Sequence, residues 1–171
     1  MRMLSVMACL VLFSGCSVQS SQLSAVMDLF KTPARDISLN SWSVKYADYE
    51  AIVYPITIPQ GTLFSNKAGD QVLFDGWSIR EVKGMGRRQV NYKNSDGKDG
   101  RSFLRGVRPL TIHPCQPWQK RKKLGKTQFS QKCGEQEGYI NTILVENDGS
   151  ISVIRQIVDD RYIPMTLTKL K

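Results

Sequence analysis

Apolar and polar residues alternate in short runs along most of the chain after residue 37. β-Branched and aromatic side chains fill every second position of these runs, and Gly, Pro and Asp interrupt them. Alternation with a period of two predicts β-strands that have one buried face. The expected strands are Trp42–Tyr46, Ala51–Ile58, Gln71–Phe74, Trp77–Lys83, Arg88–Tyr92, Leu110–His113, Tyr139–Glu146, Ser150–Ile157 and Met165–Leu170. The pattern therefore predicts a mostly β fold of antiparallel sheets, either a sandwich or an open barrel.

Three polar segments are interpreted as connections between these strands. Asp148-Gly149 predicts a tight hairpin of type I′, in which both central residues need positive φ. Asp75-Gly76 predicts a second tight turn. The segment 94–100 is expected to be a polar loop or hairpin turn, because Lys98 stands where a calcium loop needs a carboxylate.

The first thirty residues have a different pattern. Met1-Arg2 is followed by an apolar run from Met3 to Phe13 and then by Ser14-Gly15-Cys16. This layout is typical of an export signal, and its apolar run is too short for a stable transmembrane helix. We expect residues 1–15 to be a signal peptide, residues 16–22 a polar tether, and residues 23–171 a single domain. Apolar residues at helical spacing predict one short helix over Leu23–Phe30.

The four residues that end at Cys16 resemble the bacterial lipobox, although Phe13 replaces the usual Leu. The resemblance implies cleavage before Cys16 and fatty acylation of its thiol, with a plain cleaved signal as the alternative. Ser17 directly after the cysteine is similar to the sorting signal for the outer membrane, and the domain would then face the periplasm.

Two further cysteines, Cys115 and Cys133, would remain in the exported protein. In an oxidising compartment such a pair favours a disulfide. It would close a loop of about 17 residues and contribute roughly 3 kcal/mol. A metal site is the alternative, but two thiols and the single histidine, His113, are a poor ligand set, so we expect no metal and no cofactor.

Positive charge is concentrated in one stretch of the chain. Formal net charge is +9, and the stretch Lys83–Lys132 holds 14 basic residues against Asp96 and Asp99. The basic residues of the segment between the two cysteines include Lys120, Arg121, Lys122, Lys123 and Lys126, and the segment has no acidic residue. Such clustering attracts anions. Two interpretations stay open, a solvated surface loop and an anion-binding loop shaped by the disulfide.

Three tryptophans bear on the choice between these interpretations, because aromatic faces stack on sugar rings. Trp42 and Trp77 lie in strand patterns and are expected in the core. Trp118 precedes the basic run and is a candidate for contact with a glycan or a partner. Export disfavours nucleic acid, so the candidate partners are acidic polysaccharide, lipopolysaccharide, anionic lipid or an acidic envelope protein.

The sequence contains no recognisable enzyme signature. His113 has no nucleophile and carboxylate placed beside it, and a structural role is expected. The neighbours Asp159 and Asp160 would face opposite sides of a strand, so they are interpreted as turn or surface residues. We expect a protein that is not an enzyme.

Three segments carry a resemblance to a known family. They are Asp36–Leu39, the strand–turn–strand segment Gln71–Gly86, and the C-terminal segment Ile143–Lys171. Together they are similar to the group 4 capsule polysaccharide lipoprotein family, whose members are encoded with exopolysaccharide and capsule export systems. The resemblance implies an all-β envelope protein that assists polysaccharide assembly or export without catalysis. The alternative is a scaffold lipoprotein of a pilus or secretion complex that docks through the basic loop.

Overall fold

The described strands hydrogen-bond into a single antiparallel sheet in the computed structural model. The structure describes residues 40–86, 89–98, 100–123, 125–135 and 138–171, all within one compact unit, Asp36–Lys171. The strands are β1 (Trp42–Tyr46), β2 (Tyr49–Ile58), β3 (Gly61–Ser65), β4 (Gln71–Phe74), β5 (Ile79–Gly84), β6 (Val90–Gly97), β7 (Gly100–Arg105), β8 (Arg108–His113), β9 (Gln119–Lys123), β10 (Lys126–Cys133), β11 (Tyr139–Val145), β12 (Ile151–Ile157) and β13 (Pro164–Lys169). The predicted fold class, mostly β and antiparallel, is confirmed.

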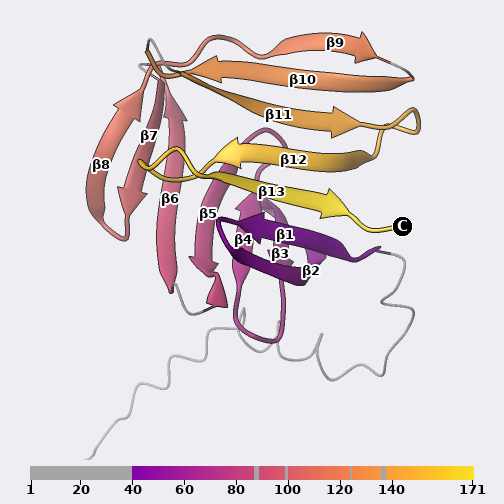
Figure 1. Cartoon of the computed structure of the whole chain (residues 1–171), viewed down its shortest axis with the longest axis horizontal. Coiled ribbons are helices and arrows are strands. Elements are labelled where there is room, and N and C mark those ends of the chain that lie inside the picture. Colours follow the sequence, from indigo (N-terminus) through magenta and orange to yellow (C-terminus); the bar gives the residue numbers. More distant parts are fainter. Residues whose placement is uncertain (1–39, 87–88, 99, 124, 136–137) are drawn as a thin grey trace, which may run out of the picture. The chain divides into compact units, whose positions relative to one another are not determined.

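The sheet curls so that its two halves form crossed layers. Its strand order is β8-β7-β6-β5-β4-β3-β2-β1-β13-β12-β11-β10-β9. Strand β2 belongs to both layers, because its first half pairs with β1 and its second half, from Tyr54, pairs with β3. In Figure 1 the strands β9 to β13 run across the direction of β6, β7 and β8. The strands β8 and β9 lie at the two edges of the sheet, although the chain connects them directly.

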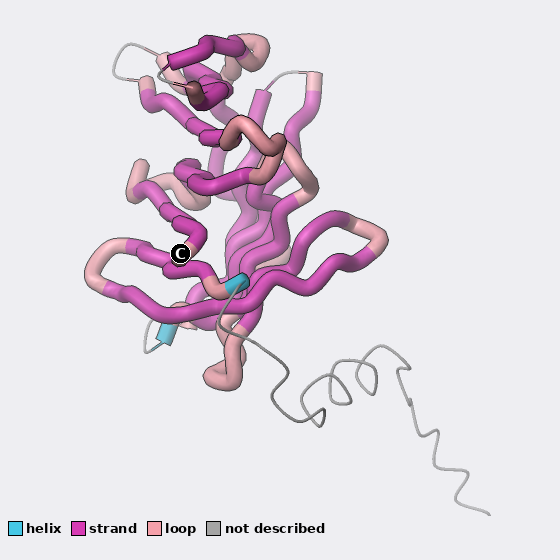
Figure 2. Tube along the Cα trace, turned by 90° about the vertical axis from the view of Figure 1, so that its right-hand side faces the viewer, coloured by secondary structure: helices cyan, strands magenta, loops and turns pink. Residues whose placement is uncertain are grey.

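Figure 2 shows strands and their connecting loops along nearly all of the described chain. In this part of the protein no helix is long and apolar enough to cross a membrane. The helix expected over Leu23–Phe30, the signal peptide, the tether and Cys16 lie outside the described residues.

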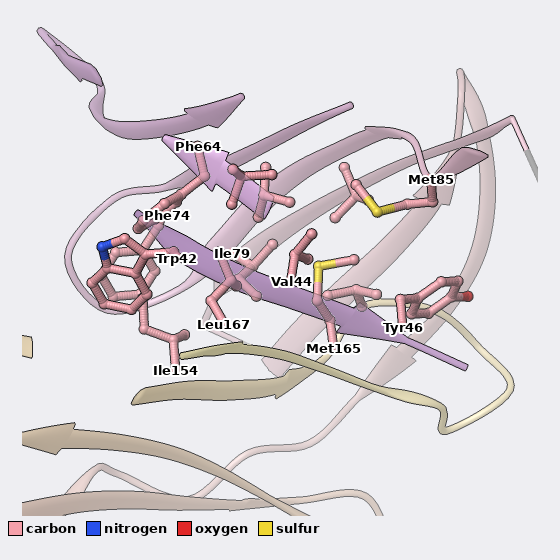
Figure 3. Packing of buried hydrophobic residues seen from close by; sticks show 14 of the residues in the cluster. Trp42, Val44, Tyr46, Phe64, Phe74, Ile79, Met85, Ile154, Met165 and Leu167 are labelled. Carbon is pink, nitrogen blue, oxygen red and sulfur yellow. The ribbon is translucent and has the colours of Figure 1, made fainter. Parts of the chain in front are cut away.

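Alternation in the sequence determines which face of each strand is buried. In β1 the side chains of Trp42, Val44 and Tyr46 are buried, whereas Ser43 and Lys45 lie on the other face. Side chains from both layers meet the buried face of β1 (Figure 3). The buried cluster also contains Val53, Phe64, Val72, Phe74, Ile79, Val82, Met85, Tyr92, Ile143, Ile154, Val158, Met165 and Leu167. Burial of this apolar surface between the layers is the main stabilising contribution.

A buried arginine ties the two layers together through hydrogen bonds. Arg101 on β7 is 0 % exposed, and its Nε donates to Asp96 at 2.9 Å. Its two terminal nitrogens donate to Ser78 Oγ (2.6 Å) and to Gln156 Oε1 (3.2 Å) on β12. The Gln156 amide then donates to the carbonyl of Trp77 at 2.7 Å. Each of the three guanidinium nitrogens thus donates to an acceptor, as burial of a charge requires.

One predicted connection differs from the structure. Around Asp148-Gly149 only Gly149 has positive φ (82°), and Glu146 accepts from the amide of Gly149 (3.1 Å). The turn is therefore a type I turn followed by a left-handed glycine, not type I′. The segment 94–100 contains the predicted hairpin turn, because β6 continues to Gly97 and pairs with β7, which starts at Gly100.

Candidate functional site

The basic segment between the two cysteines is a β-hairpin and not a loop, which corrects the expectation. Strands β9 and β10 pair from Lys123↔Lys126 to Gln119↔Ser130, around a turn where Gly125 has φ 76°. Cys115 and Cys133 form the predicted disulfide at the base of the hairpin. Beside the disulfide, the backbone N–H of Gln116 donates to the backbone carbonyl of Lys132 at 2.8 Å. The hairpin is thereby fixed to the sheet at the end opposite its turn.

Strand alternation separates the basic side chains onto two faces of this hairpin. Lys120 pairs with Phe129, which packs against the buried cluster, so both lie on the core side. Arg121 pairs with Gln128 on the opposite side, which faces away from the core. Lys132 pairs with Ile140 on that same outer side. The predicted site residues therefore do not form one surface.

The outer face of the hairpin contains a hollow of about 520 Å³, which we call the basic hollow. Its lining residues are polar or basic except for one isoleucine, and none of them is acidic. They are Gln116, Gln119, Arg121, Lys122, Gln128, Ser130, Lys132 and Ile140. Guanidinium and ammonium groups donate strong hydrogen bonds to carboxylate or sulfate oxygens, and amides and hydroxyls bind sugar hydroxyls. The half-exposed Ile140 (53 %) adds an apolar contact surface.

Aromatic side chains gather on the core side of the same hairpin. The ring of Trp77 lies 5.6 Å from that of Trp118 and 5.1 Å from that of Phe129, between ring centroids. Lys120 Nζ lies 5.8 Å from the centroid of the Phe129 ring. Trp77 is 47 % exposed, so its predicted place in the core is wrong, whereas Trp42 is buried as predicted. Trp77 belongs to the β4–β5 turn, where it covers the hairpin instead of entering the interior.

Lys126 and Lys123 differ from the other basic residues that the sequence predicted for this site. Lys126 Nζ donates to Glu146 Oε1 at 2.8 Å, across the pair β10–β11. This hydrogen bond lowers the pKa of the Glu146 carboxyl below its ordinary value. Lys126 is thus held in an ion pair away from the basic hollow. Lys123 lies in β9, and its side chain is outside the described residues.

His113 lies in an aromatic cluster at the end of β8. Its ring stacks on Tyr162, with 5.1 Å between centroids, and its Nδ1 is 3.2 Å from the hydroxyl oxygen of Tyr139. Burial lowers the pKa of His113, and the negative charge of Asp160 only partly opposes this. The imidazole is therefore held neutral among rings, and its neighbour Cys115 is engaged in the disulfide.

Asp159 lies in a bend after β12, in agreement with the predicted turn role, but it is not at the surface. Its carboxylate is 0 % exposed and accepts hydrogen bonds from the Tyr46 hydroxyl and from Arg161 Nε, the latter at 2.9 Å. The sequence does not reveal this arrangement, because Tyr46 and Asp159 are 113 positions apart. Among the described residues no group of three or more His, Cys, Asp or Glu side chains could hold a metal ion.

These features define a class, namely an all-β protein that presents a basic, polar hollow on a disulfide-anchored hairpin. The chain matches no protein-family model, no curated protein and no solved structure.

Proposed function

We propose that this protein is a non-enzymatic outer-membrane lipoprotein that assists the assembly or export of a capsule or exopolysaccharide. The observation that carries the proposal is the lining of the basic hollow. Arg121 and Lys132 lie there on the outer face with amide and hydroxyl groups, Lys122 also belongs to the lining, and the lining contains no competing carboxylate. An acidic polysaccharide offers the matching groups, because its carboxylates need cations and its hydroxyls need amides.

The compartment supports the same proposal. The lipobox-like Phe13–Cys16 segment predicts a lipid anchor on Cys16, and the Cys115–Cys133 disulfide suits an oxidising compartment outside the cytoplasm. The resemblance of three segments to capsule polysaccharide lipoproteins supports a polysaccharide as the partner. Mass spectrometry of the mature N-terminus tests the anchor, and an unmodified thiol at Cys16 would contradict it.

A binding experiment tests the basic hollow directly. We expect a soluble polyuronate such as alginate to bind the full chain in detergent and to bind the double variant Arg121→Gln/Lys132→Gln about a hundredfold more weakly. Two charge-assisted hydrogen bonds of roughly 1.5 kcal/mol each would be lost. The matched control is Lys45→Gln/Arg155→Gln, which removes the same charge from exposed positions on β1 and β12 that do not line the hollow.

Ionic strength provides a second check on this site. Exposed charges are screened beyond about 8–10 Å near physiological salt. Affinity for alginate should therefore fall steeply between low and high salt, whereas equal affinity at both would reduce the basic residues to a solubility feature. Loss of binding in the control variant as well would mean that only net charge matters.

One observation favours a second candidate, a scaffold lipoprotein of another envelope machine. Strand β9 lies at an edge of the sheet, so its outer backbone groups are placed to pair with a strand of an acidic partner protein. Cross-linking from Lys122 separates the two proposals. Polysaccharide or lipopolysaccharide adducts support the first, and a discrete protein band supports the second.

A further inference from the structure

A second hollow, of about 380 Å³, lies beside the base of β6 and β7, and we call it the arginine pocket. Its lining consists of Gln89, Val90, Asn91, Tyr92, Arg105 and Arg161. None of these residues lines the basic hollow, so the pocket is a separate feature. Its volume falls at the lower end of the range of about 300–1,000 Å³ for small-molecule sites.

Arg161 is held in a fixed orientation on one side of this pocket. Its Nε and Nη2 lie 2.9 Å and 2.8 Å from the fully buried carboxylate of Asp159. Its Nη2 also donates to the hydroxyl oxygens of Tyr46 (2.7 Å) and Tyr92 (3.1 Å). Four contacts from three buried side chains leave this guanidinium little freedom. Such preorganisation removes most of the entropic cost of ordering a binding group.

Arg105 approaches the same tyrosine from the other side. Its guanidinium carbon lies 5.5 Å from the centroid of the Tyr92 ring, and its Nη2 is 3.5 Å from the Tyr92 hydroxyl oxygen. Its Nη2 lies 3.8 Å from Asp160 Oδ1, an ion-pair distance that is too long for a hydrogen bond. That oxygen is buried and has no hydrogen-bond partner among the described residues. Arg105 therefore retains donors that can serve a ligand.

The two guanidinium groups converge on one point, the hydroxyl of Tyr92. Paired guanidiniums are the preferred protein ligands of planar carboxylates and of phosphates. The side chains of Gln89 and Asn91 lie exposed on the same lining. The Gln89 amide nitrogen donates to the carbonyl of Gly86 at 2.8 Å, so Gln89 can offer its amide oxygen to a hydroxyl group, and Asn91 can offer its amide. The pocket thus combines two anion donors with neighbouring groups for a polyol.

We infer that the arginine pocket binds the oxyanion of an acidic sugar unit, a carboxylate or a phosphate, with Arg105 and Arg161 as its ligands. The inference goes beyond the proposed function, because it rests on residues that the basic hollow does not use. Because the Asp159 and Asp160 carboxylates behind the lining offset the formal charge of the two arginines, binding depends on directed hydrogen bonds.

Isothermal titration of the full chain in detergent with three probes tests this inference. The probes are glucuronate, glucose 1-phosphate and glucose. At least one anionic probe should bind, and the one that binds better identifies the group. Glucose should not bind detectably. Arg105→Gln should lower the affinity for the anionic probe about tenfold, which corresponds to the loss of one charge-assisted hydrogen bond. The matched control Arg155→Gln should leave the affinity unchanged, since Arg155 is exposed on β12 and does not line the pocket.

A second variant keeps the test decisive if Arg105→Gln lowers the melting temperature. Tyr92→Phe preserves the buried ring but removes the hydroxyl on which both guanidiniums converge, and it should weaken the same probe. Absence of binding by both anionic probes, equal binding of glucose, or unchanged affinity in both variants would overturn the inference. Arg121→Gln/Lys132→Gln tests the basic hollow separately, so failure of one site is distinguishable from failure of the other.

Discussion

Single charged side chains connect the two layers of the curled sheet at two places. Arg101 joins β7 to β12 through Gln156, and Arg161, which is held by Asp159 after β12, donates to the Tyr92 hydroxyl on β6. Burial alone would raise the pKa of Asp96, but the hydrogen bond and charge of Arg101 bring that pKa below its ordinary value. Each buried charge therefore has specific partners, and removal of one partner leaves the other without compensation.

Replacement of Arg101 by alanine should lower the free energy of unfolding by about 3 kcal/mol, because it removes the hydrogen bonds of the buried guanidinium to Ser78, Asp96 and Gln156. Denaturant unfolding measures this loss. The matched control is Arg108→Ala in the next strand, where an exposed side chain should change stability by less than about 0.5 kcal/mol. Equal effects of the two substitutions would contradict the proposed role of Arg101.

The single histidine predicts a pH dependence of stability. His113 has a lowered pKa in the folded protein because it is buried, so the unfolded chain binds its proton first as pH falls. Stability contributed by the neutral ring should be present above pH 6.5, the ordinary value, and should decline as pH falls toward the lower folded pKa. Unfolding curves between pH 7.5 and about 5 measure this decline.

The variant His113→Phe is the control for this prediction. Because the sequence contains one histidine, no other imidazole titrates in the same range. Stability of the variant should change less over that pH range than stability of the wild type. Identical pH profiles of the two proteins would contradict the prediction.

At the scale of elements, the β9–β10 hairpin gives the basic segment a defined shape. Its strands bring Arg121, Lys132, Gln119 and Gln128 to one face, and its disulfide fixes its base. A flexible loop with the same composition would have to order all of these side chains on binding. The hairpin removes part of that cost.

Loss of the disulfide should therefore affect both stability and binding. Cys115→Ser/Cys133→Ser should lower the free energy of unfolding by about 3 kcal/mol, the chain-entropy value for a loop of this length. It should also weaken alginate binding, since the base of the hairpin is released. Denaturant unfolding and titration of the same sample check the two effects, and unchanged affinity would show that the pairing of β10 with β11 suffices.

The sequence predicts most strands because their buried faces alternate with solvated faces. Strand β9 was missed since its sequence, QKRKK, contains no apolar residue and lies at the edge of the sheet. Strand β7 was missed because Arg101, a charged residue, occupies a core position. The basic residues of the site were predicted by composition. The sequence does not show that these basic residues lie on two faces of the hairpin, or that Trp77 and Gln116 lie beside them. Both features depend on the register of strands that are far apart in the sequence.

At the scale of the whole molecule, the ion pairs along β5 to β7 contrast with the basic hollow, whose lining has no acidic residue. Along β5 to β7, Lys83 and Lys93 lie 2.9 Å and 3.7 Å from Glu81, and Arg101 contacts Asp96. On the hairpin the lining of the basic hollow contains no acidic residue. Part of the positive charge behind the net value of +9 is thus concentrated at one edge of the sheet, where an extended anionic polymer could lie.

The most direct test measures surface-attached polysaccharide in the cell that makes this protein. Deletion of the gene should reduce the amount or the attachment of the polysaccharide, and the wild-type chain should restore it. The variant Arg121→Gln/Lys132→Gln should fail to restore it at equal abundance, whereas Lys45→Gln/Arg155→Gln should succeed. Unchanged polysaccharide in the deletion strain would contradict the account.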